Sequence, residues 1–272
     1  MKKMLIVMTL CVAALIGVWF YISSNYIYLS SYNGNSSGLV NVKKVESIDL
    51  NESDNTESRL KKISDCVNLK NLIISCDIDD LYFLDGVDID QLYIISNCDN
   101  WESIECLKGV RYLYINPMIS DDLSTFNDCS VLKKLDSIEE LTITNFEEEI
   151  DYSGIEELLN LKSLSIYSGI IDFGKIRIPS SVDKITLQTG LTNKGDNAIE
   201  NIRRLNNTDI KTISMSNSYI SDFSFVTLLE NIKSIEFRDC IFAEKESDIN
   251  VVISNLKSKN IEVSLENCKF SE

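Results

Sequence analysis

The side chains with the clearest capacity for chemistry in this chain are carboxylates, because the sequence contains no histidine. Without histidine the chain lacks the commonest general base, the Ser-His and Cys-His nucleophile pairs and imidazole metal sites. Two carboxylates can still share acid and base roles. The candidates considered for such roles include Asp79 with Asp80, Asp121 with Asp122, and Glu147 to Glu149. All of them fall in expected turns, where acidic residues usually solvate the surface or cap short helices. No acidic loop matches an EF-hand, so we expect no catalytic residue, metal site or cofactor.

A second group of side chains could act by recognition. Its members are large apolar or aromatic residues in the first half of the chain, which we call the tyrosine patch: Ile73, Tyr93, Ile95, Tyr112 and Tyr114. Tyrosine suits recognition because it combines a large contact area with a polar tip. Tyr93 follows Ile73 by 20 residues, and Tyr114 follows Tyr93 by 21. Whether these residues share a surface depends on elements that recur with the same spacing.

Such elements are indicated by a six-residue sequence motif, apolar-x-x-apolar-x-apolar, that recurs along the chain and that we call the phrase. The copies are VESIDL at Val45, LKNLII at Leu69, IDQLYI at Ile89, VRYLYI at Val110, IEELTI at Ile138, LKSLSI at Leu161, VDKITL at Val182, IKTISM at Ile210 and IKSIEF at Ile232, with an imperfect tenth copy at Asn260. Successive copies start 20 to 28 residues apart. A fixed phrase with this period is typical of a repeat architecture, in which each unit stacks on its neighbours.

Each phrase predicts one short strand. Its fourth and sixth positions share a face and point inward, while its third, fifth and seventh positions point the other way. We therefore expect an α/β solenoid with a curved parallel sheet of about ten strands. Its convex side would carry loops, short 3-10 turns and a few helices. Apolar residues near the helical period predict helices at 197–205 and 248–256, and less clearly at 123–135.

The repeats resemble those of leucine-rich repeat proteins. The fuller family pattern continues to Asn or Cys and then to an apolar residue, as in the segment from Ile232 through Cys240 to Phe242, and again through Cys268 and Phe270. The short returns, such as CDIDDLYFLDGV from Cys76 and YISDFSFVTLLENI from Tyr219, are similar to those of bacterial internalin-type surface repeats. The resemblance covers roughly residues 45 to 270 and implies a solenoid with a concave binding face.

On such a sheet the tyrosine patch would be contiguous, because adjacent strands lie about 4.8 Å apart. Outward-facing aromatic groups gathered in this way are typical of recognition sites. Two other interpretations remain open: the aromatic neighbours could only stiffen the sheet, or the N-terminal segment could pack over them. From the fifth repeat onward the same row is mostly Ser and Thr, namely Thr142, Ser165, Thr186 and Ser214.

The N-terminus predicts a membrane segment. Lys2 and Lys3 precede an uncharged, mostly apolar run at residues 4–22 that ends in aromatic residues, about the length needed to cross a bilayer. The run is long for a signal peptide and has no convincing cleavage site, which favours an uncleaved signal anchor. Removal as a signal peptide is the alternative. Cys11 lacks the preceding small residue of a lipoprotein acceptor. The lysines would remain cytoplasmic and the repeats would lie outside.

Residues 23–44 are rich in Ser, Asn, Gly and Tyr and are expected to form a linker or an N-terminal cap. Tyr26, Tyr28 and Tyr32 could lie among lipid headgroups or cover the first repeat. The expected division of the chain is therefore a membrane segment at 1–22, this linker or cap at 23–44, and repeats at 45–272.

Cysteine usage and net charge limit the remaining classes of function. Cys240 and Cys268 hold the same position in adjacent repeats and could form a buried thiol ladder, which the pattern favours, or a disulfide. The eight cysteines include no CxxC pair of the kind that binds zinc. A net charge of −16 argues against a nucleic-acid partner.

The function hypothesis from the sequence is a monomeric, membrane-anchored extracellular leucine-rich repeat protein of bacterial type. It would bind a protein partner through its concave face at Ile73, Tyr93, Ile95, Tyr112 and Tyr114. A carbohydrate or cell-wall binding module is the alternative, because tyrosine faces also stack on sugars. An enzyme or enzyme regulator fits less well, since the usual catalytic groups are missing.

Overall fold

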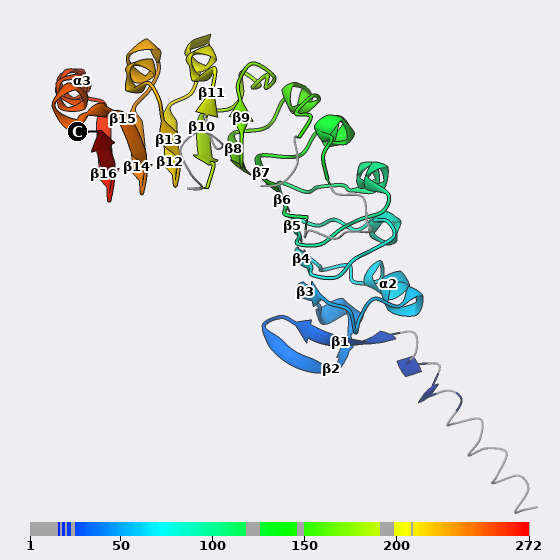
Figure 1. Cartoon of the computed structure of the whole chain (residues 1–272). Coiled ribbons are helices and arrows are strands. Elements are labelled where there is room, and N and C mark those ends of the chain that lie inside the picture. Colours follow the sequence, from blue (N-terminus) through cyan, green and yellow to red (C-terminus); the bar gives the residue numbers. More distant parts are fainter. Residues whose placement is uncertain are drawn as a thin grey trace, which may run out of the picture.

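The computed structural model of the chain is a curved solenoid, with its strands on the inner side of the arc and its helical turns on the outer side (Figure 1). The structure describes residues 16, 18–19, 21–22, 25–117, 126–145, 150–190, 199–207 and 209–271. Its main sheet has 12 strands in the order β16-β14-β12-β10-β8-β7-β6-β5-β4-β3-β1-β2. The predicted solenoid with one curved sheet is confirmed.

All ten predicted strands are present and parallel. They are β3 (Ser47–Leu50), β4 (Asn71–Ile74), β5 (Gln91–Ile94), β6 (Tyr112–Ile115), β7 (Glu140–Asn145), β8 (Ser163–Ser168), β10 (Lys184–Gln188), β12 (Thr212–Ser216), β14 (Ser234–Arg238) and β16 (Glu262–Glu266). Equivalent positions of the phrase pair across the sheet, as Leu72 does with Leu92 and Leu92 with Leu113. The register follows from the phrase because a slip by one residue would turn the apolar side chains toward water.

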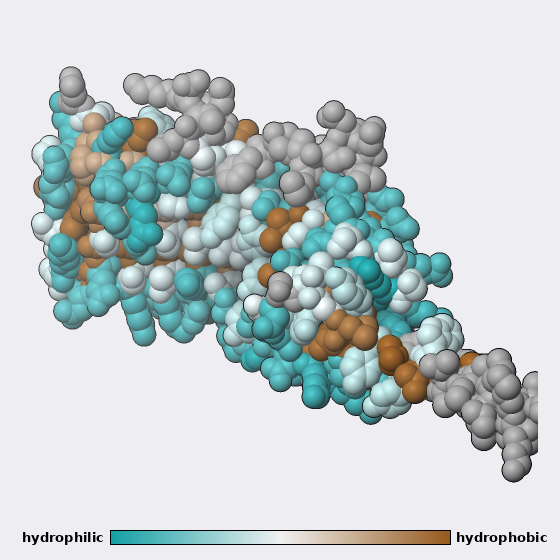
Figure 2. Space-filling view, turned by 90° about the horizontal axis from the view of Figure 1, so that it is seen from below, coloured by the Kyte–Doolittle hydropathy of each residue, from teal (hydrophilic) through white to brown (hydrophobic). Residues whose placement is uncertain are grey.

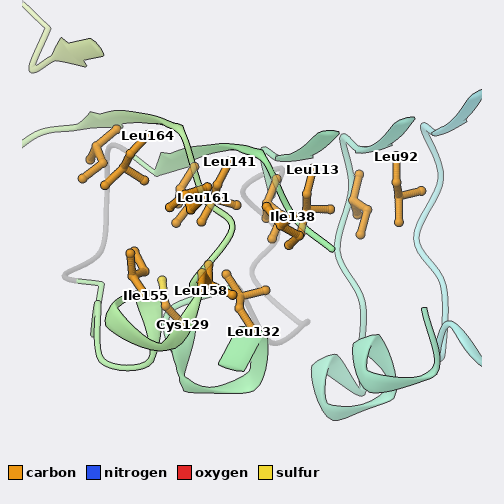
Figure 3. Close-up of a cluster of buried hydrophobic side chains, with 14 of the residues drawn as sticks. Leu92, Leu113, Cys129, Leu132, Ile138, Leu141, Ile155, Leu158, Leu161 and Leu164 are labelled. Carbon is orange, nitrogen blue, oxygen red and sulfur yellow. The ribbon is translucent and has the colours of Figure 1, made fainter. Parts of the chain in front are cut away.

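The core lies between the strands and the convex turns. Leu113 and Leu141 point inward from the strands, and Leu132 and Leu158 reach toward them from the turns (Figure 3). All four are at most 2% exposed. Each buried leucine of this kind contributes about 1.5–3 kcal/mol relative to an exposed one. A repeat makes these contacts only with its neighbours, so the core is continuous along the arc.

The convex side carries short helical elements. These are α2 (Glu57–Ile63), η2 (Tyr82–Leu84), η3 (Trp101–Cys106), η4 (Cys129–Lys134), η5 (Ile155–Glu157), η6 (Ile202–Asn207), η7 (Phe223–Leu228) and α3 (Glu246–Ser258), where η denotes a 3-10 helix. Small parallel sheets accompany them: β9 (Ile171–Asp172) with β11 (Ile199–Glu200), and β13 (Tyr219–Ile220), β15 (Ile241–Lys245) and β17 (Lys269–Ser271).

Of the predicted helices, the one at 248–256 is confirmed as α3 and the other two are not α-helices. The predicted helix at 123–135 contains only the 3-10 turn η4 among its described residues. The prediction at 197–205 is wrong over the described part, because Ile199 joins β11 and pairs with Ile171. The apolar residues of this segment have helical spacing because a strand residue followed by a 3-10 turn also directs them toward the core.

Aspartates begin several of these convex turns. The carboxylates of Asp80, Asp128, Asp151 and Asp222 each accept a hydrogen bond from the backbone N–H two residues later, at 2.7 to 2.9 Å. This local bond supplies a partner to a backbone group at the start of the turn. Much of the acidic character of the convex side therefore has a structural role.

An antiparallel hairpin closes the N-terminal end of the solenoid. Its strands are β1 (Tyr26–Tyr32) and β2 (Asn35–Asn41), followed by the 3-10 turn η1 (Val42–Lys44). Strand β1 lies beside β3 and buries Ile27 and Leu29 against the first repeat. The residues of this segment that cover the first repeat are Ile27 and Leu29, whereas Tyr28 is 47% exposed.

The predicted membrane segment lies mostly outside the described residues. Those that are described, Ile16, Val18, Trp19, Tyr21 and Ile22, have helical backbone and side chains that are 39% to 64% exposed. Within the part of the chain that the structure describes, no helix has the length and apolar character needed to span a bilayer.

Candidate binding surface on the concave face

The tyrosine patch lies on three neighbouring strands of the concave face. Ile73 of β4 pairs with Tyr93 of β5, and Tyr93 pairs with Tyr114 of β6. Tyr112 occupies the position two residues before Tyr114 on the same strand, and Ile95 follows the end of β5. All five side chains are partly exposed, whereas their inward-facing neighbours on these strands are buried. The structure thus brings all five residues onto one surface.

The two central tyrosine rings contact each other. The ring centroids of Tyr93 and Tyr114 are 5.9 Å apart, and the ring planes are tilted by 38°. The Tyr93 hydroxyl donates a long hydrogen bond of 3.4 Å to the side-chain oxygen of Gln91. Such aromatic pairs contribute about 0.5–1.5 kcal/mol beyond the burial of their area. The pair therefore adds a contact between β5 and β6, and both tyrosines stay partly exposed.

The third tyrosine of the patch is held by a cation. The guanidinium of Arg111 lies over the Tyr112 ring, 5.5 Å from its centroid. Arg111 also forms an ion pair with Asp90 at 2.6 Å, and this hydrogen bond raises the pKa of the guanidinium above its usual value. The Tyr112 ring is consequently fixed at the side of the patch where the strands begin.

Charged residues border the patch at that side. The second position of each complete phrase holds a charged residue, and the charge alternates between negative and positive from one repeat to the next along most of the sheet. We call these residues the charge row: Glu46, Lys70, Asp90, Arg111, Glu139, Lys162, Asp183, Lys211 and Lys233. The row contains the pairs Arg111 with Asp90, Lys162 with Glu139 at 2.6 Å, and Lys211 with Asp183 at 3.1 Å. Lys162 lowers the pKa of Glu139 through its hydrogen bond. Sequence reasoning missed this row, although the phrase alone would have aligned it.

The opposite rim of the patch is polar. The Ser75 hydroxyl donates to the carboxylate of Asp49 at 3.2 Å, and Asp49 pairs with Ile73 across the sheet. The patch is therefore an aromatic and apolar area with acidic groups on one side and the charge row on another. Such a core-and-rim arrangement is common in protein interfaces.

The described hairpin of the N-terminal segment lies beside the sheet and not over this surface. The hairpin β1–β2 extends the sheet beyond β3 and does not stack on β4 to β6. Asp54 anchors it from the first repeat: this fully buried carboxylate accepts hydrogen bonds from the backbone N–H and the hydroxyl of Ser30, and it pairs with Arg59 at 2.9 Å. The alternative in which the segment packs over the patch does not apply to its described residues.

The carboxylates considered for acid and base chemistry do not form a described site. Asp79 and Asp80 line a convex groove of about 670 Å³ between α2 and η2. Asp80 uses its carboxylate to begin η2, as described above. Asp121, Asp122 and Glu147 to Glu149 lie outside the described residues. No cluster of potential metal ligands occurs among the residues that are described.

Cys240 and Cys268 hold equivalent positions in adjacent repeats as two thiols and not as a disulfide, with Cys240 buried and Cys268 partly exposed. No disulfide joins any of the seven cysteines in the described part of the chain, and Cys11 lies outside it. The sulfur of Cys240 donates to the carbonyl of Met215 at 3.4 Å, and that of Cys268 donates to the carbonyl of Phe237 at 3.6 Å. Ser218 holds the same position one repeat earlier and accepts from the backbone N–H of Thr189 at 3.2 Å. These three side chains therefore hydrogen-bond to the backbone of a preceding repeat at the same position of each unit.

Comparisons with known proteins concern the fold alone. No family model matches the chain, and no curated protein matches it. Among solved structures, the chain is similar to internalin C2 from Listeria monocytogenes strain 4b F2365, with 20% identity and a TM-score of 0.43 over 85% of this chain and 86% of that one. It is also similar to the internalin InlF of the same strain, with 17% identity and a TM-score of 0.44 over 88% and 87% of the two chains. Both are internalins, the type of repeat protein that the sequence resembles.

Proposed function

We propose that this chain is a membrane-anchored bacterial surface protein that binds a protein partner through the tyrosine patch on its concave face. The observation that carries the proposal is the row of Ile73, Tyr93 and Tyr114, which places partly exposed apolar and aromatic side chains side by side on three strands. Buried aromatic anchors surrounded by a polar rim supply most of the binding energy of typical protein interfaces.

The geometry favours a protein over a carbohydrate. A sugar ring stacks best on a flat aromatic face, but the 38° tilt between Tyr93 and Tyr114 leaves no flat platform that spans both strands. The tilted pair, with Ile73 beside it, better fits an apolar side chain of a partner. Binding of the chain to a glycan array, with loss of that binding on removal of the tyrosines, would favour the carbohydrate module instead.

The patch is tested by removing its two central rings. We expect Tyr93→Ser with Tyr114→Ser to reduce partner capture at least tenfold, since a hot-spot tyrosine of an interface contributes about 2 kcal/mol or more. Thr186→Ala with Ser214→Ala is the matched control, because these residues occupy the same row on β10 and β12. Full-length chains in nanodiscs would be compared for quantitative retention of cell-surface proteins. Equal retention by both variants would exclude the patch as the binding site.

The anchor rests on the apolar run at residues 4–22 and on the exposed Ile16, Val18, Trp19, Tyr21 and Ile22 at its end. The described pieces of this segment lie outside the arc of repeats, beyond the N-terminal hairpin (Figure 1), and an exposed apolar run of this length suits a membrane segment. Intact cells expressing the chain should keep it in the membrane fraction after a high-salt wash, with the repeats open to added protease. Recovery of a shortened chain from the medium would show that the segment is a cleaved signal peptide.

A further inference from the structure

The two ends of the solenoid are finished differently. At the N-terminal end the hairpin buries its own apolar residues, with Ile27 and Leu29 at most 2% exposed. At the other end β16 is the last strand of the sheet, and among the described residues no strand pairs with its outer edge. Hydrophobic residues are visible at this end of the molecule, where β16 and α3 lie (Figure 2).

The last repeat exposes side chains that every interior repeat buries. Val263 and Leu265 are partly exposed, whereas their partners on β14, Ile235 and Phe237, are at most 1% exposed. Phe270 of β17 is also partly exposed and stacks on the buried Phe242 at 5.5 Å. We call the outer surface formed by Val263, Leu265, Cys268 and Phe270 the open end.

The backbone of the open end is suited to strand addition. Glu262 donates its N–H to Lys233, and Glu266 accepts from Asp239 with its carbonyl, both at 2.8 Å. Successive residues of a strand direct their backbone groups to opposite sides. The N–H and C=O groups of Val263 and Leu265 therefore point away from β14 and are available to another strand.

The charges beside this edge disfavour a second copy of the chain. If two β16 strands paired antiparallel about Ser264, Glu262 of each copy would lie opposite Glu266 of the other. Like charges placed directly opposite each other destabilise a strand pair. Both glutamates are exposed, and among the described residues an ion pair is formed by Glu266, with Arg238 at 2.8 Å, but not by Glu262. The same glutamates would attract basic residues at the facing positions of a different strand.

We propose that the open end binds an extended segment of another protein in which basic residues alternate with apolar ones. Its apolar side chains would cover Val263 and Leu265, and basic residues four positions apart would face Glu262 and Glu266. Main-chain hydrogen bonds to the edge would supply affinity, and the charges would supply selectivity. This surface is separate from the tyrosine patch, which lies on β4 to β6.

The test uses two synthetic peptides with the full-length chain in nanodiscs. The first, GTKVSLKTG, carries lysines four residues apart, and the second, GTEVSLETG, replaces them with glutamates. We expect the lysine peptide to bind at least tenfold more tightly, to weaken with added salt, and to slow amide hydrogen exchange at Val263 and Leu265. Equal affinities, or exchange at these two amides that no peptide changes, would overturn the proposal.

Charge reversal on the chain provides the second arm. Glu262→Lys with Glu266→Lys should reverse the preference, so that the glutamate peptide binds more tightly than the lysine peptide. Both side chains are exposed, so their replacement leaves the core intact. Glu102→Lys with Glu157→Lys makes the same change of net charge at exposed convex positions and should leave the preference unaltered. Sedimentation of the wild-type chain as a dimer through β16 would instead show that the occupant is a second copy. Peptide preference is measured without the concave partner, so its failure would leave the proposed function standing.

Discussion

At the scale of single residues, the buried carboxylate of Asp54 stabilises the attachment of the hairpin to the first repeat. It is fully buried and supplies an acceptor to Ser30 of the hairpin and to Arg59 of α2. Removing one member of a buried charged group leaves the others without a partner. Because Arg59 is 29% exposed and regains some hydration, we expect Asp54→Ala to cost about 2–3 kcal/mol. Urea unfolding would measure this loss in the free energy of unfolding.

Glu52→Ala is the control, because Glu52 is exposed, and it should change the free energy of unfolding by less than about 0.5 kcal/mol. An equally small change for Asp54→Ala would contradict the role of Asp54 in holding the hairpin.

The buried thiols make a prediction about pH. Burial raises the pKa of Cys66 and of Cys76 to about 12, and that of Cys98 and of Cys240 to about 11, from 9.0. The unfolded chain loses these protons at lower pH than the folded chain does. Their contribution to stability is therefore fully present below pH 9 and is lost as the pH rises toward 11 to 12.

The free energy of unfolding should consequently fall more steeply between pH 9 and pH 11 in the wild-type chain than in Cys66→Ala with Cys76→Ala. Urea titrations of both proteins at several pH values would show the difference in slope. The comparison uses slopes because the cavities left by the alanines lower stability at every pH. Parallel slopes would show that these thiols do not contribute.

At the scale of elements, the N-terminal hairpin depends on one turn. Asn33 and Gly34 connect β1 to β2 with positive φ values of 48° and 72°. The Asn33 side chain also donates to the carbonyl of Lys44 and accepts from the N–H groups of Glu46 and Ser47, at 2.8 to 2.9 Å. We expect Asn33→Ala to cost about 1–2 kcal/mol, because it strains the turn and removes three exposed hydrogen bonds.

The measurement that isolates this effect is amide hydrogen exchange at Ile27 and Leu29, which should quicken in the variant while exchange in β8 and β10 stays unchanged. Asn35→Ala is a suitable control, since Asn35 has φ outside the positive region and its side chain makes a single long bond of 3.3 Å. Unaltered exchange at Ile27 and Leu29 in Asn33→Ala would mean that the hairpin is held by other contacts.

The sequence predicted the strands better than the segments between them. Strand positions follow from a phrase whose period of two is imposed by burial, so positions such as Leu92 and Leu113 could be aligned without a structure. The hairpin was missed because its Ser- and Asn-rich composition is that of a linker, although Asn33-Gly34 between two alternating runs is a hairpin signal. The helix predicted at 197–205 was wrong because apolar spacing does not distinguish an α-helix from a strand followed by a 3-10 turn.

The tyrosine patch was also accessible from the sequence, for the same reason. Once the strands are in register, Ile73, Tyr93 and Tyr114 must be neighbours. The tilt of the rings and the position of Arg111 over Tyr112 could not be predicted, because they depend on side-chain torsions and not on register. The open end was missed because Val263 and Leu265 occupy the same two apolar positions as in the other phrases, and the sequence alone does not show what covers their outer side.

At the scale of the whole molecule, two electrostatic effects oppose each other. The charge row favours the folded state through its alternating pairs, but these pairs are exposed: Lys211 and Asp183, for example, have side chains that are 49% and 46% accessible. Exposed pairs contribute at most about 1 kcal/mol each. The chain also carries 42 acidic and 26 basic residues, a net charge of −16 that disfavours a compact state.

We expect the repulsion to exceed the pairing, because it sums over many carboxylates at long range. Salt shortens the screening length from about 30 Å at 0.01 M to about 8 Å at 0.15 M, and so weakens distant repulsion more than contacts at 3 Å. The urea midpoint should therefore rise over this range of sodium chloride. Glu102→Gln with Glu157→Gln removes two negative charges at exposed positions with no part in the charge row, and it should make the rise smaller. A midpoint that falls with salt would instead show that the charge row governs the stability of the solenoid.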